Sequence, residues 1–185
     1  MRVVGGIARG RHLLGPKGRE TRPTSDKVRE AIFDMIGNDL GGERVLDLFA
    51  GTGALGIEAL SRGASEAIFV ERSSAACRVI RANLEATGLT DGARLVCQPV
   101  ERALSEPYGV FDLILLDPPY AYADVARIMS RLGESPLVGD ETAVVFEHSS
   151  RLAVDNSYAR LGLERDKVYG DTAVSIFVSQ EDTRA

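Results

Sequence analysis

Beyond residue 40, short apolar runs alternate with helical patterns, and this alternation restricts the possible folds more than any other feature of the sequence. The helical patterns occupy residues 54–63 and 73–88, and each ends in a glycine, a common helix stop. Strands that alternate with helices form a mostly parallel sheet with helices on both faces. The sequence therefore predicts a doubly wound α/β domain. Its strands are expected at residues 44–49, 66–71, 93–97, 111–117, 142–148 and 172–179.

Both ends of the chain depart from this alternation. The stretch LERDKVYGDTAVSIFVS, residues 163–179, predicts an antiparallel hairpin with a tight turn at YGDT. Near the N-terminus, a glycine-rich hairpin is predicted before a helix over residues 24–39, with Thr24 as its N-cap. We therefore expect a small extension, residues 1–40, attached to a main domain formed by residues 41–185.

The first predicted strand runs into a glycine-rich turn, in the stretch VLDLFAGTGALG at residues 45–56. In an open parallel sheet, ligands bind beyond the carboxyl ends of the strands, where such a turn lets them approach the backbone. Glu71, which ends the next strand, can accept hydrogen bonds from ribose hydroxyls there. Both a nicotinamide dinucleotide and S-adenosylmethionine (SAM) carry an adenosine ribose, so either cofactor fits the glycines Gly51, Gly53 and Gly56.

Asp47 indicates which of these two cofactors the site binds. Its position inside the first strand, just before the turn, brings a carboxylate to the middle of the bound ligand. There it repels the pyrophosphate of a dinucleotide and attracts the sulfonium and ammonium groups of SAM. An aspartate in an apolar central strand needs a partner, and the alternative explanation is that it caps a loop or pairs with a nearby arginine such as Arg44. The sequence thus favours SAM over the cofactor of a nicotinamide oxidoreductase.

A second stretch, FDLILLDPPY, places reactive groups at the same edge of the sheet. Prolines donate no backbone hydrogen bond, so the strand end offers two acceptors, the Asp117 carboxylate and the Pro118 carbonyl. Two acceptors can hold the hydrogens of an exocyclic amine and direct its lone pair at the methyl group of SAM. Tyr120 can stack on the base that carries this amine. A strand terminator with a structural tyrosine is the simpler explanation of this motif taken alone.

Taken in order, the motifs DLFAGTG, an acidic strand end and DPPY resemble the class I SAM-dependent amino methyltransferases. With TRPTSDKVREAIFDMI and the hairpin before it, the chain closely resembles the RsmD family, from Arg2 to the YGDT turn. That family methylates N2 of one guanine in small-subunit ribosomal RNA. The resemblance implies a seven-stranded sheet with an antiparallel last strand, and a partly or fully assembled small ribosomal subunit as substrate. It also places residues 21–24 near the active site.

The charge distribution adds an expected RNA-binding surface. Residues 1–29 carry eight lysine and arginine residues against two acidic ones, although the formal net charge of the chain is −5. A basic segment on an acidic body is typical of polyanion binding, and a solvated basic face is the alternative. The predicted RNA contacts are Arg9, Arg11, Lys17, Arg19, Arg22, Pro23, Thr24 and Arg29, with Tyr120 at the target base.

The predicted cofactor site departs from related enzymes in one place. They commonly carry an acidic residue after the third strand to contact the adenine amine, whereas this chain reads VCQPVERAL. Gln98 can accept from that amine through its side-chain oxygen, and a backbone group is the alternative. The expected cofactor is SAM, with S-adenosylhomocysteine (SAH) as its product, and no metal ion. Its predicted binding residues are Asp47, Phe49, Gly51, Thr52, Gly53, Glu71, Gln98 and Asp117.

Several other classes are excluded by the sequence. No apolar run approaches the ~20 residues of a membrane span, and no secretory signal is visible, so a cytoplasmic protein without an obligate protein partner is expected. Cys77 and Cys97 form no zinc pattern, and both are expected as buried reduced thiols. Two functional alternatives remain open: a DNA amino methyltransferase, and a non-catalytic RNA-binding or ribosome assembly factor that keeps the SAM fold.

Overall fold

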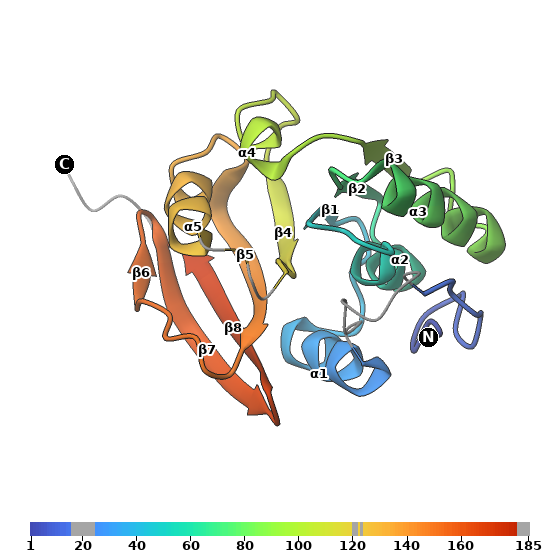
Figure 1. Ribbon diagram of the computed structural model, residues 1–185, viewed down its shortest axis with the longest axis horizontal. Helices are drawn as coiled ribbons and strands as arrows, with labels where there is room; N and C mark the ends of the chain where they lie inside the picture. The colour runs from blue at the N-terminus through green and yellow to red at the C-terminus, as the bar shows by residue number, and fades with distance from the viewer. Residues whose placement is uncertain (16–24, 120–121, 123, 181–185) are drawn as a thin grey trace.

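The computed structural model describes residues 1–15, 25–119, 122 and 124–180, and its strands and helices alternate as predicted (Figure 1). Each predicted strand run contains a strand, and helices α4 and α5 and the short strand β6 are additional to the prediction. No helix in these residues is long and apolar enough to cross a membrane. In chain order the elements are α1 (Asp26–Ile36), β1 (Arg44–Leu48), α2 (Ala54–Ser61), β2 (Glu66–Val70), α3 (Ser74–Thr87), β3 (Ala93–Val96), α4 (Val100–Ala103), β4 (Phe111–Leu116), α5 (Val125–Gly133), β5 (Val138–Ser149), β6 (Ser157–Tyr158), β7 (Leu161–Tyr169) and β8 (Thr172–Ser179).

These strands form an eight-stranded sheet in the order β3-β2-β1-β4-β5-β8-β7-β6. The first five pair in parallel, whereas β8, β7 and β6 pair antiparallel. The mostly parallel sheet and the C-terminal hairpin, β7 and β8, are therefore confirmed. The sheet has one strand more than the predicted seven, because the two residues of β6 add an edge strand too short to leave a sequence pattern.

Helices cover both faces of the sheet, and successive strand residues enter two different hydrophobic cores. In β1, Val45 belongs to the core beneath α1, α2 and α3, whereas Leu46 and Leu48 belong to the core beneath α4 and α5. Figure 1 shows these two groups of helices on either side of the sheet. Strand β1 is thus buried on both faces, and the strand order reverses beside it. Such a reversal is where open α/β sheets bind ligands.

Local sequence signals explain where two of the helices begin and end. Ser73 caps α3, and Gly88 ends it in the left-handed conformation, with φ of 71°. Helix α1 begins after Ser25, whose hydroxyl accepts a hydrogen bond from the Val28 N–H at 3.2 Å. The prediction of Thr24 as this cap is wrong, because Ser25 is the residue whose hydroxyl lies within reach of that amide. Thr24 itself lies outside the described residues.

The N-terminal residues 1–15 fold back on themselves and join the main core. The predicted hairpin is present as one isolated bridge between Arg2 and His12. Val3 and Leu13 are buried in the same hydrophobic core as the helices α1, α2 and α3. The extension therefore packs on the domain that carries the glycine turn.

One buried carboxylate of α2 holds this extension in place. Glu58 accepts hydrogen bonds from the backbone N–H groups of Val4 at 2.8 Å and Gly5 at 2.7 Å. It also pairs with the guanidinium groups of Arg62 at 2.9 Å and Arg29 at 3.5 Å. Because all of Glu58 is buried, its charge is stable there only with these partners.

The two cysteines do not match their prediction. The structure joins Cys77, near the start of α3, to Cys97, just after β3, by a disulfide bond, with the two Cα atoms 6.4 Å apart. Cys77 is buried, but Cys97 is exposed. The prediction of two buried reduced thiols is therefore wrong. The physical reason is the crossover from β2 through α3 to β3, which returns the chain beside the start of α3.

Candidate active site

The parallel register aligns the ends of four strands at one edge of the sheet. Leu48, the last residue of β1, pairs with Val70 of β2 and Leu116 of β4, and Val70 pairs with Val96 of β3. The segments that follow these strands therefore lie along the same edge. They are residues 49–53, 71, 97–98 and 117–119, and they include most of the residues predicted to bind the cofactor.

The turn between β1 and α2 uses left-handed backbone at three positions. Phe49 has φ of 60°, Gly51 of 56° and Gly53 of 77°. A bulky residue such as Phe49 seldom adopts positive φ, and such strain is concentrated at functional sites. Gly56 serves a different purpose, because a Cβ atom there would overlap the ring of Phe69. The missing side chain lets α2 pack closely on the sheet, directly behind the turn.

Asp47 lies beneath this turn and is buried in β1. Its Oδ2 atom accepts a hydrogen bond from the Gly56 N–H, in the first turn of α2, at 2.9 Å. Burial, followed by the charges of Asp117 and Glu71, raises the pKa of Asp47 to about 8, and the Gly56 hydrogen bond opposes this rise. Arg44, the alternative partner, lies at the opposite end of β1 and pairs with a carboxylate of β2 at 2.8 Å.

Glu71 links the end of β2 to the glycine turn. Its Oε2 atom accepts from the Gly51 N–H at 3.0 Å, and its Oε1 atom accepts from the Ser73 N–H at 2.7 Å. Each carboxylate oxygen has two lone pairs, so Glu71 can accept hydrogen bonds from a ribose in addition to these two. The backbone hydrogen bonds fix the carboxylate at the edge where an adenosine would approach.

Three carboxylates, those of Asp47, Glu71 and Asp117, make this edge electronegative. The charges of Glu71 and Asp117 both act on Asp47 and raise its pKa. A cation bound among the three would favour their ionised forms, whereas a pyrophosphate would add to the repulsion. The arrangement therefore fits a sulfonium and an ammonium group. Within the described residues, no cluster of three or more His, Cys, Asp or Glu side chains could hold a metal ion.

The segment after β4 brings the predicted catalytic residues to the same edge. Asp117 is partly buried, Pro118 is buried and Pro119 is exposed. The Pro119 carbonyl accepts a hydrogen bond from the Tyr122 N–H at 2.8 Å. Tyr120, the last residue of DPPY, lies outside the described residues.

Tyr122 is a residue of this site that the sequence motifs did not indicate. Its ring lies edge-on to Phe49 with centroids 5.0 Å apart, and its hydroxyl donates to the Glu101 carboxylate of α4. Burial, and then the bond to Glu101, raise the pKa of Tyr122 to about 12. The same bond holds the pKa of Glu101 below its usual value. Tyr122 thereby connects the glycine turn to α4 and to the segment that follows β4. In the sequence, the role of Tyr122 is indicated only by an aromatic residue two positions after DPPY.

Gln98, two residues after β3, is oriented by a neighbouring tyrosine. Its Nε2 atom donates to the Tyr108 hydroxyl at 3.2 Å, and the Arg94 guanidinium lies over the Tyr108 ring, 5.1 Å from the centroid. Because the amide nitrogen faces Tyr108, the amide oxygen of Gln98 faces away from it. The amide oxygen is the atom that could accept a hydrogen bond from an adenine amine.

The structure separates the predicted RNA contacts into two groups. Arg9 and Arg11 are exposed on the N-terminal extension. Arg29, in contrast, is buried in α1, and its guanidinium bonds to Asp26 at 2.8 Å as well as to Glu58. The prediction that Arg29 contacts RNA phosphates is wrong, because a phosphate cannot reach a buried guanidinium. The other predicted contacts, Lys17, Arg19, Arg22, Pro23 and Thr24, lie outside the described residues.

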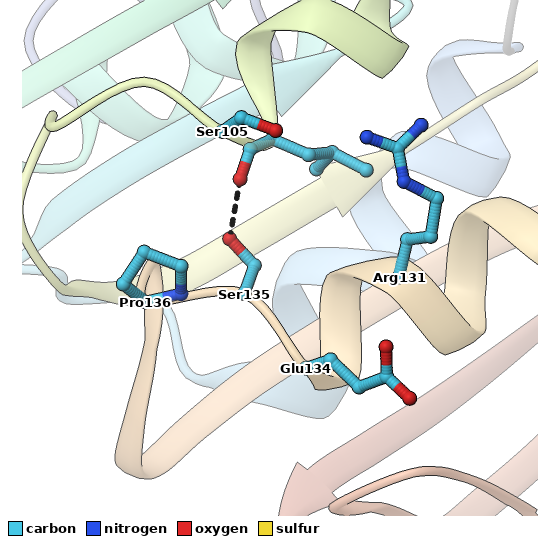
Figure 2. Close-up of a pocket in the computed structure, with 6 residues that line it drawn as sticks. Ser105, Arg131, Glu134, Ser135 and Pro136 are labelled. Atoms are coloured by element: carbon cyan, nitrogen blue, oxygen red, sulfur yellow. Dashed lines mark hydrogen bonds between the residues drawn. The ribbon is translucent and has the colours of Figure 1, made fainter.

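An open pocket of about 370 Å³ is lined by none of the residues predicted from the sequence to form the site (Figure 2). It is found before the starts of β4 and β5, at the sheet edge opposite to the glycine turn. The Ser135 hydroxyl donates to the carbonyl of Leu104, another lining residue, at 2.8 Å, and Figure 2 marks this bond with a dashed line. The remaining lining residues are Ser105, Arg131, Glu134 and Pro136.

Comparison with known proteins identifies the family. The sequence matches the family described as Conserved hypothetical protein 95 over residues 1–178. The chain belongs to this family. It is the RsmD family that the motifs predicted, and the match includes both the N-terminal extension and the DPPY motif.

Relatives in the RsmD family align with nearly the whole chain. Ribosomal RNA small subunit methyltransferase D of Escherichia coli K12 is 32% identical over 177 residues, which cover 96% of this chain and 89% of the relative. The YlbH protein of Bacillus subtilis is 39% identical over 180 residues, 96% of this chain and 98% of its own. The solved structure of the Escherichia coli yhhF protein, 32% identical, superposes with a TM-score of 0.85 over 97% of this chain and 98% of that chain.

Membership of the RsmD family agrees with the geometry of the site. The fold is that of a class I methyltransferase, and the enzyme is a methyltransferase. A hypothetical protein of Thermus thermophilus, 36% identical, has the same fold, with a TM-score of 0.81 over 95% of this chain and 98% of that chain.

Proposed function

We propose that this protein transfers a methyl group from SAM to the exocyclic N2 amine of a guanine in small-subunit ribosomal RNA. One observation carries the proposal: Asp117 and Pro118 leave β4 at the sheet edge where the glycine turn and the carboxylates of Asp47 and Glu71 also lie. The name of the Escherichia coli relative, a ribosomal RNA small subunit methyltransferase, supports this substrate class. A reaction on ribosomal RNA implies a cytoplasmic protein.

The residues at the glycine turn support SAM as the cofactor. SAM supplies a methyl group activated by a positively charged sulfur. Glu71 would accept hydrogen bonds from the ribose hydroxyls, and Gln98 would accept one from the adenine amine. Asp47 would interact with the positive charge from beneath the turn. The walls of the site would be completed by Phe49 and Thr52 and by the backbone of the two left-handed glycines, Gly51 and Gly53.

The reaction needs a nucleophile that guanine supplies poorly by itself, because the N2 lone pair is delocalised into the ring. The Asp117 carboxylate and the Pro118 carbonyl would accept hydrogen bonds from the two N2 hydrogens. This contact orients the amine and favours a pyramidal nitrogen, whose lone pair then points at the methyl carbon. As the N–C bond forms, the C–S bond breaks, and its electrons neutralise the sulfur to give SAH. The methylated nitrogen then loses one proton, for which the Asp117 carboxylate is the adjacent acceptor.

The exposed N-terminal residues would bind the RNA around the target base. Arg9 and Arg11 are exposed on an otherwise acidic protein, and the Arg11 guanidinium also donates to the Ala86 carbonyl of α3 at 3.0 Å. Both would contact phosphates, together with Lys17, Arg19 and Arg22. A stacked or paired guanine must leave its stack to reach Asp117, so a splayed or loop guanine is expected. Tyr120 would stack on that base.

Methyl transfer from labelled SAM tests the proposal. The substrates are small ribosomal subunits from cells that lack the endogenous enzyme, with naked small-subunit RNA and duplex DNA in parallel. The proposal expects one N2-methylguanine in the RNA, and the comparison of subunits with naked RNA identifies the assembly state that is methylated. Label in DNA alone would favour a DNA amino methyltransferase, and SAM binding without any transfer would favour an assembly factor. Either result would overturn the proposal.

A further inference from the structure

Asn83 of α3 connects the N-terminal extension to the glycine turn. The side chain is completely buried. Its Oδ1 atom accepts a hydrogen bond from the Leu14 N–H at 2.7 Å. Its Nδ2 atom donates to the Leu14 carbonyl at 3.2 Å and to the Thr52 carbonyl at 2.9 Å. One amide group therefore binds both backbone groups of Leu14 and, at the same time, the centre of the glycine turn.

Only one orientation of the Asn83 amide gives all three neighbouring backbone groups a hydrogen-bond partner. A backbone N–H needs an acceptor and the two carbonyls need donors, so the oxygen faces the Leu14 N–H and the nitrogen faces both carbonyls. Both hydrogens of the nitrogen are engaged. A shift of either segment alone would leave a buried polar group of Asn83 without its bond, which is costly in a protein interior.

The two connected segments belong to different parts of the proposed reaction. Thr52 lies between Gly51 and Gly53, in the turn that would hold SAM. Leu14 lies three residues after Arg11, at the end of the described extension, and its own side chain is 57% exposed. The position of Leu14 is therefore fixed mainly through its backbone. Arg9 and Arg11, which are exposed and predicted to contact RNA, precede it by five and three residues.

We propose that Asn83 is a positioning residue that couples cofactor binding to RNA binding. The inference rests on the proposed function. A ligand that holds the glycine turn fixes Thr52, and through Asn83 it fixes the backbone of Leu14, three residues after the exposed Arg11. RNA then binds beside a backbone position that is already fixed, so each ligand raises the affinity of the other by the same factor.

Hydrogen exchange with SAH as the probe tests this coupling without RNA. In the wild-type protein, saturating SAH should slow exchange at the Leu14 amide as well as at the amides of the glycine turn. In Asn83→Ala, the turn should still be protected, but Leu14 should not. SAH binding that protects the turn and leaves Leu14 unchanged in the wild-type protein would overturn the inference, and this result does not depend on whether any variant folds.

Titration of small ribosomal subunits with and without SAH provides the second measurement. Wild-type affinity should rise about fivefold or more with SAH, the usual lower range of such coupling. The rise should disappear in Asn83→Ala. The matched control is Thr87→Val, which removes a buried hydroxyl one turn along α3 that bonds only to carbonyls of the same helix.

A purely structural role predicts a different pattern. If Asn83 only stabilised the fold, Asn83→Ala would lower the melting temperature and leave the SAH-dependent rise in affinity equal to that of Thr87→Val. That equality would overturn the inference. Calorimetry measures SAH binding by itself. If no SAH binds, both the proposed cofactor and the coupling are overturned; if SAH binds but does not change RNA affinity, only the coupling is overturned.

Discussion

The Asp47 carboxylate and the Gly56 amide, nine residues apart in the chain, meet at 2.9 Å beneath the glycine turn. The amide offsets part of the cost of burying the carboxylate. Burial and the nearby charges of Asp117 and Glu71 nevertheless place the pKa of Asp47 at about 8. At pH 7 the free protein therefore carries Asp47 mostly in its protonated form, and a cation bound close by would favour ionisation.

SAM binding should release a proton from Asp47. The sulfonium charge lowers the pKa of the carboxyl, so SAM affinity should rise as the pH increases from 6 toward 9. SAH has no sulfonium charge, and its affinity should change less. Calorimetry in two buffers of different ionisation enthalpy measures the released protons. Asp47→Asn is the control: on binding SAM it should release no more protons than on binding SAH. Equal proton release for SAM and SAH in the wild-type protein would contradict the prediction.

The same proton makes stability depend on pH. A carboxyl whose pKa is 3.8 in the unfolded chain and about 8 in the folded protein favours the folded state fully below pH 4, and this contribution is lost as the pH rises through 8. The ligand-free protein should therefore melt at lower temperature at pH 9 than at pH 6. The melting temperature should change less with pH in Asp47→Asn. Each kcal/mol of stability that the Asp47 proton contributes corresponds to about 2–4 °C in melting temperature. Thermal unfolding at constant ionic strength checks this, and parallel slopes would refute it.

Asp117→Asn should lose methyl transfer and keep cofactor binding. The variant replaces a charged acceptor by an amide, so the rate should fall by about 100-fold or more, the usual effect of removing a preorganised polar contact. SAH affinity should change little. The pKa of Asp47 should fall, because one like charge is gone. Asp140→Asn, an exposed change at the start of β5, is the charge-matched control. Normal turnover in Asp117→Asn would remove Asp117 from the mechanism.

Tyr122→Phe should weaken cofactor binding only slightly, whereas Tyr122→Ala should weaken it more. The phenylalanine keeps the edge contact with Phe49 and loses only the bond to Glu101. Glu101→Gln, combined with Tyr122→Phe in a double-mutant cycle, measures that bond. The raised pKa of Tyr122 and the lowered pKa of Glu101 keep both partners in their bonding forms between pH 6 and 9. The cycle should give the same coupling across that range, and a pH-dependent coupling would argue against this pair.

Removing Arg9 and Arg11 should affect RNA binding and not the cofactor. Arg9→Gln with Arg11→Gln should lower RNA affinity and reduce the salt slope of log K by about 0.7–0.9 for each phosphate that is no longer neutralised. Arg29→Met should act differently, since removing one partner of a buried ion pair costs about 3–5 kcal/mol of stability. Salt titrations of RNA binding, with thermal melts of each variant, separate the two effects. An unchanged salt slope in the double variant would exclude the extension as a phosphate-binding surface.

Those parts of the site that depend on local pattern could be predicted from the sequence. Strand ends, the glycine turn and the DPPY motif each occupy a short continuous stretch, and parallel pairing brings such stretches to one edge. Glu71 and Asp117 could therefore be placed together from their positions after two apolar runs.

Residues whose environment is set by distant parts of the chain could not be predicted in this way. Arg29 follows Val28 in a helical pattern that gives no sign of a buried guanidinium; its burial depends on Glu58, which lies on another helix. Likewise, the disulfide from Cys77 depends on the return of β3 beside α3. The role of Asn83 required the positions of three separate segments, and no spacing in the sequence encodes that meeting.

The burial of Glu58 also bears on how such a protein can evolve. Its carboxylate is held by two backbone amides from the first five residues, by Arg29 and by Arg62. A related protein that lost or exchanged the extension would keep the buried Glu58 carboxylate without most of its hydrogen-bond and ion-pair partners. Loss or exchange of the extension would therefore be costly to stability, so we expect changes of RNA target to come from substitutions at its exposed residues.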